Sequence, residues 1–271
     1  MRGFTQDDAH HFVRPDQLEE EVLGILDLAF TIYRTLGFTD FTLRLSLHDP
    51  KNKVKYIGTE ENWSLAETAL RSALTKQKLP FTEAVGEAAF YGPKIDLIVH
   101  DAFGREWQLG TIPQVDYNMP ERFALEYTDK DGTRKRPIML HRAIFGSFER
   151  FMGVLIEHFK GLFPLWLSPV QIGLLPVAAV HEDYAQEVAK NLREKGIRVQ
   201  IYYSDESLGK RIREGEKLKI PYLLVLGDEE VSGRSVSVRN VKTKAQAGHS
   251  FADFLKKIIE EIESRSLESL V

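Results

Sequence analysis

The 271-residue sequence contains no cysteine. A disulfide framework is therefore excluded, and so are a thiolate nucleophile and a metal site built from this chain's own sulfur. The sequence also lacks an apolar run near the ~20 residues that a membrane helix needs. Its charged beginning, Met1-Arg2-Gly3-Phe4-Thr5-Gln6-Asp7-Asp8, has no apolar signal-peptide core. These absences predict a cytoplasmic chain with no membrane partner.

The familiar nucleotide and zinc motifs are also missing. There is no G-x-x-x-x-G-K-[ST], no G-x-G-x-x-G and no H-E-x-x-H. An ATP-using enzyme of this sequence would need another way to hold phosphate. Neither sign of charge dominates, because 36 basic and 40 acidic residues leave a net charge of −4. This balance argues against general DNA coating, although a local basic patch can still bind a specific nucleic acid.

The length suggests two domains at roughly 150 residues each. In the first half, apolar residues at helical spacing predict a helix over 18–36 that ends at Gly37, and strict alternation predicts a strand over 41–47. Other predicted elements are a strand over 2–11, a helix over 63–76, strands over 95–100 and 105–112, a hairpin of 123–128 with 136–141, and a helix over 147–159. Residues 85–145 should therefore form a largely antiparallel sheet.

Two prolines flank a short apolar bridge at residues 163–169, after which strands and helices alternate. We place the domain boundary there, between a domain of residues 1–166 and an α/β domain of residues 168–271. The second domain should contain strands over 171–177, 197–203, 222–226 and 235–241, helices over 182–195 and 208–219, a hairpin through Ser232-Gly233, and a final helix around Phe251 to Ile262.

His10 and His141 are the first candidates for chemistry. If residues 2–11 form a strand, Gln6, Asp8 and His10 share one face, and His11 points the other way. A carboxylate, an amide and an imidazole would then converge. The competing interpretation is that each histidine is an ordinary hydrogen-bonded residue at a strand edge.

Four long segments resemble the threonyl-tRNA synthetases. They are Arg2 to His10 (RGFTQDDAH), Ala89 to Ile95 (AFYGPKI), Trp107 to Thr111 (WQLGT) and His141 to Phe151 (HRAIFGSFERF). The bridge at 163–169 and the α/β module that follows are similar to that family's anticodon-binding domain. The resemblance spans nearly the whole chain. It implies an α+β class II synthetase catalytic core with an antiparallel sheet, followed by an α/β anticodon-binding domain.

The resemblance also implies roles for individual residues. His10 and His141 would be two of three protein ligands of a catalytic Zn²⁺, whose open position takes threonine. Asp8 would accept the proton of the threonine hydroxyl. The remaining assignments are Arg2, Gln6, Lys94 and Arg150 as catalytic residues; Tyr91 and Gln114 in the threonine pocket; and Gln108, Thr111, Ser147 and Arg150 around ATP, which enters with Mg²⁺.

Several family features have no counterpart in the sequence. The first class II motif, the arginine that opens the second motif, the cysteine zinc ligand and the editing region are missing, so the chain is expected to be the C-terminal part of a synthetase. Alone, it should bind zinc poorly and support little threonine-dependent ATP–pyrophosphate exchange. The family forms homodimers through the first motif, so this chain could be a monomer. Pro113 is an apparent insertion that would shift Gln114 to the opposite face.

In the second domain, Arg213, Glu230 and Arg239 fall where the family reads the anticodon of threonine tRNA. The competing interpretation is that these are ordinary surface charges with no role in binding tRNA. The solvent-exposed face of one amphipathic helix could be formed by Lys210, Arg211, Arg213, Lys217 and Lys219. For the whole chain, the leading hypothesis is threonine–tRNA ligase. The alternative is a non-catalytic tRNA-binding fragment or paralogue. A hydrolase using His10, Asp8 and Ser147 lacks a nucleophile-elbow sequence.

Overall fold

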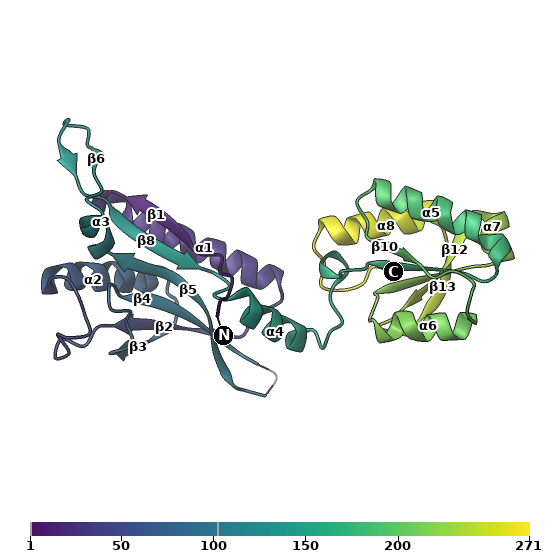
Figure 1. The fold of residues 1–271 in the computed structure, drawn as a ribbon, viewed down its shortest axis with the longest axis horizontal. Coiled ribbons are helices and arrows are strands. Elements are labelled where there is room, and N and C mark those ends of the chain that lie inside the picture. Colours follow the sequence, from purple (N-terminus) through teal and green to yellow (C-terminus); the bar gives the residue numbers. More distant parts are fainter. Residues whose placement is uncertain (1, 102) are drawn as a thin grey trace. The chain divides into compact units, whose positions relative to one another are not determined.

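The computed structural model describes residues 2–101 and 103–271. The chain divides into two compact units, Met1–Glu157 and His158–Val271 (Figure 1). The division falls before the proline-flanked bridge at residues 163–169, which therefore lies within the second unit. Each unit has its own sheet, so each is described by itself.

A six-stranded sheet forms the first unit, in the order β1-β8-β5-β4-β2-β3. The strands are β1 (Ala9–Val13), β2 (Phe41–Leu47), β3 (Phe81–Val85), β4 (Lys94–His100), β5 (Glu106–Asp116) and β8 (Ile138–Ala143). All neighbours are antiparallel except β2 and β3, which are parallel. The predicted antiparallel core is confirmed, with one parallel edge added.

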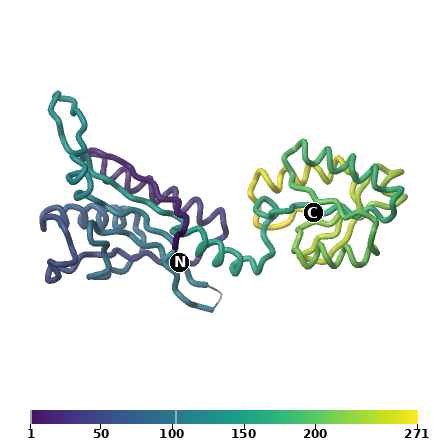
Figure 2. Tube along the Cα trace, in the orientation of Figure 1, coloured from purple at the N-terminus to yellow at the C-terminus, as the bar shows by residue number. Residues whose placement is uncertain are grey.

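Helices cover one face of this sheet (Figures 1 and 2). They are α1 (Leu18–Thr35) and α2 (Glu60–Lys76), and a turn of 3-10 helix (Pro15–Gln17) precedes α1. The unit also contains α3 (Asn118–Arg122) and α4 (Phe148–His158). The apolar periodicity of α1 is confirmed, because Val22, Ile25 and Ala29 are almost fully buried. At its end, the buried Tyr33 hydroxyl donates to the carbonyl of Ile144 at 2.7 Å, which ties α1 to the segment before α4.

Three predictions for this unit are wrong in detail. The strand predicted over 2–11 begins only at Ala9. Residues 123–126 are not a strand, and the hairpin around Asp131-Gly132 is confined to β6 (Tyr127–Thr128) and β7 (Arg134–Lys135). Strand β3 was not predicted, because it is a half-exposed edge strand with weak alternation. Edge strands bury little surface and so leave a weak sequence signal.

Pro113 lies within β5, which continues past it to Asp116. The bond between Ile112 and Pro113 is cis, and the pairing register shifts between Thr111 and Gln114. The additional residue is thus absorbed as a local irregularity, as a β-bulge does. Gln114 still pairs with Lys94 on one side and His141 on the other, so the expected change of face does not occur.

The second unit is a five-stranded sheet in the order β10-β9-β11-β12-β13. Its strands are β9 (Ile172–Pro176), β10 (Val199–Ile201), β11 (Tyr222–Leu226), β12 (Ser235–Asn240) and β13 (Gln246–Ser250). Its helices are α5 (Glu182–Glu194), α6 (Leu208–Lys217), α7 (Asp228–Gly233) and α8 (Phe251–Glu263), with 3-10 turns at Leu165–Leu167 and Ala179–His181. The first three strands in that order are parallel, which confirms the α/β prediction.

Helices pack on both faces of this second sheet (Figure 1). Val188 of α5 and Phe254 of α8 belong to one apolar cluster, and Leu223 and Ile212 belong to the cluster under α6. The hairpin predicted at Ser232-Gly233 is wrong: these residues end α7, and Arg234 takes a left-handed conformation after it. Strand β13 was not predicted, because most of its residues are polar or small and exposed.

Arg211 differs from the other cations of α6. It is 3% exposed, and its guanidinium donates to the carbonyls of Pro176 at 2.7 Å and Tyr202 at 2.9 Å. These carbonyls follow two parallel strands, so Arg211 satisfies backbone acceptors at the sheet edge. The interpretation of Arg211 as part of a solvated helix face is therefore wrong.

None of the helices in the part of the chain that the structure describes is both long and apolar enough to span a bilayer.

His48 follows β2 and is held by two carboxylates of α2. Its Nδ1 lies 2.6 Å from Glu67 Oε1 and its Nε2 lies 3.3 Å from Glu60 Oε2, and its ring stacks on Trp63. Burial lowers the pKa of His48, but hydrogen bonds to Glu67 and Glu60 outweigh burial and raise that pKa above its ordinary value of 6.5. The protonated ring therefore joins the end of β2 to α2.

We expect His48→Gln to destabilise the first unit most at low pH. The raised pKa means that protonated His48 contributes fully below the unfolded pKa of 6.5, and the contribution is lost as pH rises through the folded pKa. Hydrogen bonds to charged groups of this kind contribute roughly 1.5–3 kcal/mol. Chemical denaturation at pH 6 and pH 9 measures the difference. Glu61→Gln changes an exposed carboxylate next to Glu60 on α2 and should show no such pH dependence. An equal loss for His48→Gln at both pH values would contradict the assignment.

Candidate active site

Four of the predicted site residues form one row across the first sheet. Lys94 on β4 pairs with Gln114 on β5, Gln114 pairs with His141 on β8, and His141 pairs with His10 on β1. Residues in register across neighbouring strands point to the same face. Val115, next to Gln114, and Leu140, next to His141, are buried on the opposite face. The row therefore lies on the sheet face away from the core.

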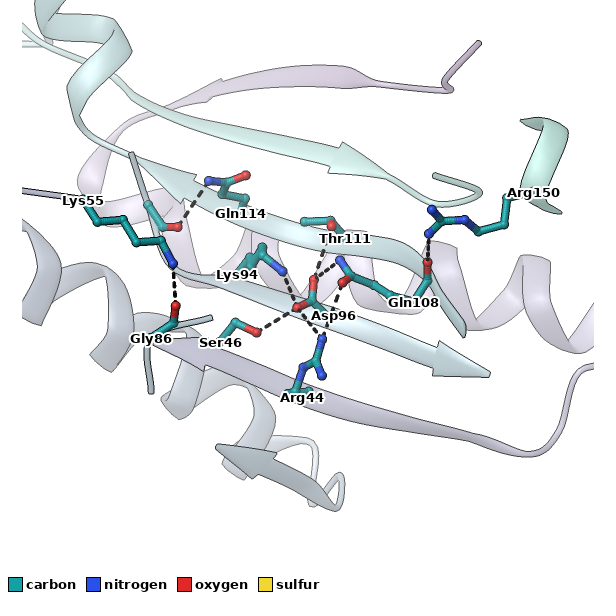
Figure 3. A network of polar contacts seen from close by, with 11 residues as sticks. Arg44, Ser46, Lys55, Gly86, Lys94, Asp96, Gln108, Thr111, Gln114 and Arg150 are labelled. Atoms are coloured by element: carbon teal, nitrogen blue, oxygen red, sulfur yellow. Dashed lines mark hydrogen bonds and ion pairs between the residues drawn. The ribbon is translucent and has the colours of Figure 1, made fainter. Parts of the chain in front are cut away.

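A second row lies two residues along the strands and centres on Asp96. Asp96 pairs with Thr111 and with Arg44. Its carboxylate is fully buried and accepts hydrogen bonds from Gln108 Nε2 at 2.7 Å and, at 3.4 Å, from Thr111 Oγ1 (Figure 3). Two residues assigned to ATP are thus held by one carboxylate that the sequence analysis did not single out.

The other oxygen of Asp96 contacts a hydroxyl and two cations. Ser46 Oγ donates to it at 2.7 Å, the Lys94 ammonium donates to it as well, and Arg44 Nη2 lies 3.6 Å away (Figure 3). A buried charge is tolerated when it is paired and hydrogen-bonded in this way. With two cations around one carboxylate, the cluster retains positive charge that suits a phosphate or a carboxylate ligand.

A cleft of about 780 Å³ adjoins this network. Its lining includes the predicted residues Gln6, Gln108, Thr111, Ser147 and Arg150, together with Trp107. Arg150 Nη1 donates to the carbonyl of Gln108 at 3.1 Å, and its guanidinium lies 5.9 Å from the centre of the Trp107 ring. An ionised arginine beside a partly exposed aromatic ring is a suitable arrangement for a nucleotide.

The segment before α4 shapes one wall of this cleft. Ser147 Oγ accepts from the backbone N–H of Arg150 at 3.2 Å, and Gln6 forms an isolated bridge with Ser147. Gly146 has a φ of +60°, and a Cβ there would lie 2.2 Å from the carbonyl oxygen of Leu109. Only glycine allows the chain to pass β5 this closely.

Asp8, His10 and His141 converge at the other end of the first row. One ligand atom from each lies within 4.8 Å of the others, and the two imidazole rings meet edge to face. His141 Nε2 lies 2.9 Å from Asp116 Oδ2, and Asp116 is fully buried. A carboxylate that orients an imidazole is typical of histidine metal ligands. His11 faces away, as predicted, and pairs with Glu21.

Tyr91 and Gln114 complete this group. The Tyr91 ring lies 5.3 Å from that of His141. Burial, together with the charges of Asp116 and Asp8, raises the pKa of Tyr91, so its hydroxyl stays protonated as a donor. Gln114 Nε2 donates to the carbonyl of Gly92 at 3.2 Å.

The structure does not place every predicted residue at the site. Arg2 is exposed and does not line the cleft. In the second unit, Arg213 is exposed on α6, and Arg239 on β12 donates to Glu216. Glu230 Oε2 accepts from the backbone N–H of Gly227, so it caps α7. Arg239 thus lies beside Glu216, whereas Glu230 has a local structural contact of its own.

Three residues of the site were missed: Asp96, Arg44 and Asp116. A signal did exist for Asp96 and Arg44, because each lies two residues from another polar residue on its strand and so shares a face with it. These pairs are Asp96 with Lys94, and Arg44 with Ser46. Asp116 follows Gln114 at the same spacing. Period-2 alternation puts each on the site face, but nothing in the linear sequence says which strands are neighbours.

Two domain families match the chain. The tRNA synthetase class II core domain (G, H, P, S and T) matches residues 1–159, and the anticodon binding domain matches residues 171–261. The first match covers more than half of the chain and includes the whole row from Lys94 to His10. The chain therefore belongs to the class II tRNA synthetase family.

Within this family the similarity is to threonine–tRNA ligases. The chain is 51% identical over 268 residues to the Threonine--tRNA ligase of Thermus thermophilus, covering 99% of the chain and 40% of that protein. It is 49% identical over 265 residues to that of Prosthecochloris aestuarii, covering 98% of the chain and again 40% of the relative. The chain thus spans less than half the length of these relatives.

Two solved structures with similar folds are also threonyl-tRNA synthetases or parts of them. The RNA binding domain of Threonyl-tRNA synthetase from Cryptosporidium parvum Iowa II superposes with a TM-score of 0.87 at 41% identity, covering 98% of this chain and 65% of that one. The putative threonyl-tRNA synthetase ThrRS-1 from Aeropyrum pernix gives a TM-score of 0.77 at 30% identity, covering 99% and 65%. The fold predicted for both units is confirmed.

Proposed function

We propose that the chain carries the amino-acid activation site and the anticodon-reading module of a cytoplasmic threonine–tRNA ligase. The threonine carboxylate would attack the α-phosphorus of Mg²⁺-bound ATP, and the bond to the bridging oxygen would break to release pyrophosphate. The terminal ribose hydroxyl of threonine tRNA would then lose its proton and attack the adenylate carbonyl, releasing AMP. The observation that supports this best is the row from Lys94 to His10. One end of the row contacts Asp96, which holds Gln108 at the cleft, and the other end belongs to the three-ligand group.

The nucleotide half of the reaction depends on positioning and charge neutralisation. Arg150 would contact the triphosphate from the start of α4, and Gln108 and Thr111 would hold the nucleoside along β5. Lys94 belongs to the first row and donates to Asp96 in the second, and its ammonium would stabilise charge on the reacting carboxylate and α-phosphate. Asp96 keeps Lys94 and Gln108 in place throughout.

The threonine half would lie at Asp8, His10 and His141, with Tyr91 and Gln114 beside it. Two imidazoles and a carboxylate within 4.8 Å of one another fit Zn²⁺. When bound, the metal would act as a Lewis acid toward the amino and hydroxyl groups of threonine. Asp116 orients the His141 ring, and the protonated Tyr91 hydroxyl can donate to the amino acid.

The alternative is a chain that binds tRNA but forms no adenylate. It requires only the second unit, which matches the anticodon binding domain over residues 171–261. Both hypotheses include recognition of threonine tRNA by the second unit, so tRNA binding does not separate them. Binding of an adenylate analogue does.

We expect the chain to bind a non-hydrolysable threonyl-adenylate analogue, a threonyl sulfamate of adenosine. The valine counterpart, which has a methyl group in place of the hydroxyl, should bind at least about 10-fold more weakly, because a site built to hydrogen-bond a hydroxyl leaves polar groups unpaired without it. Quenching of Trp107, which lines the cleft, or calorimetry gives both affinities. Arg150→Ala should weaken both analogues alike. Binding of threonine tRNA without binding of either analogue would favour the alternative.

A further inference from the structure

One carboxylate in the second unit binds two cations from different elements. Glu216 Oε1, on α6, accepts hydrogen bonds from Nε and Nη2 of Arg239, on β12, at 2.9 and 2.8 Å. The same oxygen lies 3.1 Å from Nζ of Lys244, in the turn between β12 and β13. Glu216 and Arg239 are both about three-quarters buried, whereas Lys244 is exposed.

This geometry fixes which edge of the Arg239 guanidinium faces Glu216. The contact uses the side of the fork that carries Nε and one terminal nitrogen. A guanidinium is planar, so the N–H groups on its other side point away from Glu216 in a defined direction. These free groups form a planar, bidentate donor edge, which matches the acceptor atoms on the edge of an unstacked base.

The charges of the cluster favour the same conclusion. The hydrogen bond from Arg239, followed by that from Lys244, lowers the pKa of Glu216, so the carboxylate remains ionised at neutral pH. Two cations and one anion leave net positive charge, which suits RNA. Arg213 lies three residues before Glu216 on α6 and adds a further positive charge to the same side of the helix.

We infer that Glu216 is a positioning residue for anticodon recognition: it holds the guanidinium of Arg239 in the orientation that reads an unpaired base of the tRNA. This inference rests on the proposed function, in which Arg239 contacts the anticodon. A simple surface ion pair would contribute little to stability or to selectivity. The orienting role predicts instead that Glu216 affects discrimination between tRNAs and acts only through Arg239.

The test measures binding of the full chain to threonine tRNA and to the same tRNA with a changed anticodon. We expect Glu216→Gln to reduce the ratio of the two affinities by about 3- to 10-fold, because a neutral amide oxygen holds the guanidinium more weakly than a carboxylate does. In an Arg239→Ala background the same substitution should leave the ratio unchanged. Glu214→Gln, also on α6 but exposed, is the matched control, and it should change both affinities alike through charge.

The outcomes distinguish the anticodon role of Arg239 from the positioning role of Glu216. If Arg239→Ala leaves the ratio unchanged, the proposed anticodon role fails at that residue. If Arg239→Ala lowers the ratio but Glu216→Gln only raises both affinities equally, the positioning role is overturned and the anticodon role stands. Glu216→Asp provides a second variant that keeps the charge but withdraws it by one methylene, and a partial loss of discrimination is expected. A ratio for Glu216→Asp equal to that of the unmodified chain, with Glu216→Gln also unchanged, would overturn the inference.

Discussion

Asp96→Ala is expected to lower the free energy of unfolding of the first unit by roughly 3–5 kcal/mol. The carboxylate is fully buried, and its removal leaves the Lys94 ammonium and the Arg44 guanidinium close together without the negative charge between them. Gln108 and Ser46 also lose their acceptor. Urea denaturation followed by circular dichroism measures the loss, with the second unit providing a separate transition as an internal reference.

Ser46→Ala is the control for this substitution. It removes one hydrogen bond from the same carboxylate without changing its charge, so it should cost only about 1 kcal/mol. Asp96→Asn keeps the shape but not the charge, and it should weaken binding of the adenylate analogue even where the protein remains folded. A loss on Asp96→Ala no larger than that on Ser46→Ala would contradict the view that Asp96 balances both cations.

The sequence predicts those parts of the candidate site that lie in continuous segments. Lys94, Gln108 and Ser147 belong to three of the segments that resemble the family, and each lies at the cleft or in the network beside it. Arg2 belongs to a fourth, yet it is exposed, because the strand it was assigned to begins only at Ala9. Side chains alternate between the two faces of a sheet only within a strand, so this alternation does not predict the direction of residues that precede the strand.

Contacts across strands could not be predicted in the same way. Asp96 matters because β4 lies between β2 and β5, which is a property of sheet order. Pro113 also shows that the pairing of strands cannot be predicted from the sequence of one strand. Its insertion in β5 predicted a reversed face for Gln114, but the pairing shifts locally and Gln114 keeps its place beside His141. Register is set by the whole sheet, so one inserted residue does not determine it.

Helical charge patterns were ambiguous for a related reason. Arg211 and Arg213 both lie among the cations of α6, but Arg211 is buried against strand-end carbonyls and Arg213 is exposed. The spacing of two residues turns their side chains to different sides of the helix. Which side faces the sheet depends on how α6 packs, and the polar residues around them do not reveal it.

The last expected result concerns the metal. We expect Zn²⁺ binding by the chain to fall by more than about 10²-fold on His10→Ala or His141→Ala, since even the loss of a group that only orients a ligand costs 10–100-fold. Asp8→Asn should also weaken binding, because the chain has no cysteine and Asp8 is the third group whose ligand atom lies within 4.8 Å of the two imidazoles. Equilibrium dialysis with Zn²⁺, or the visible spectrum of Co²⁺ in the same site, gives the affinities. His11→Gln is the matched control: His11 lies beside His10 on β1 but faces Glu21, so its loss should leave metal binding unchanged. Stoichiometric zinc retained by the His10→Ala and His141→Ala variants would show that the metal binds elsewhere.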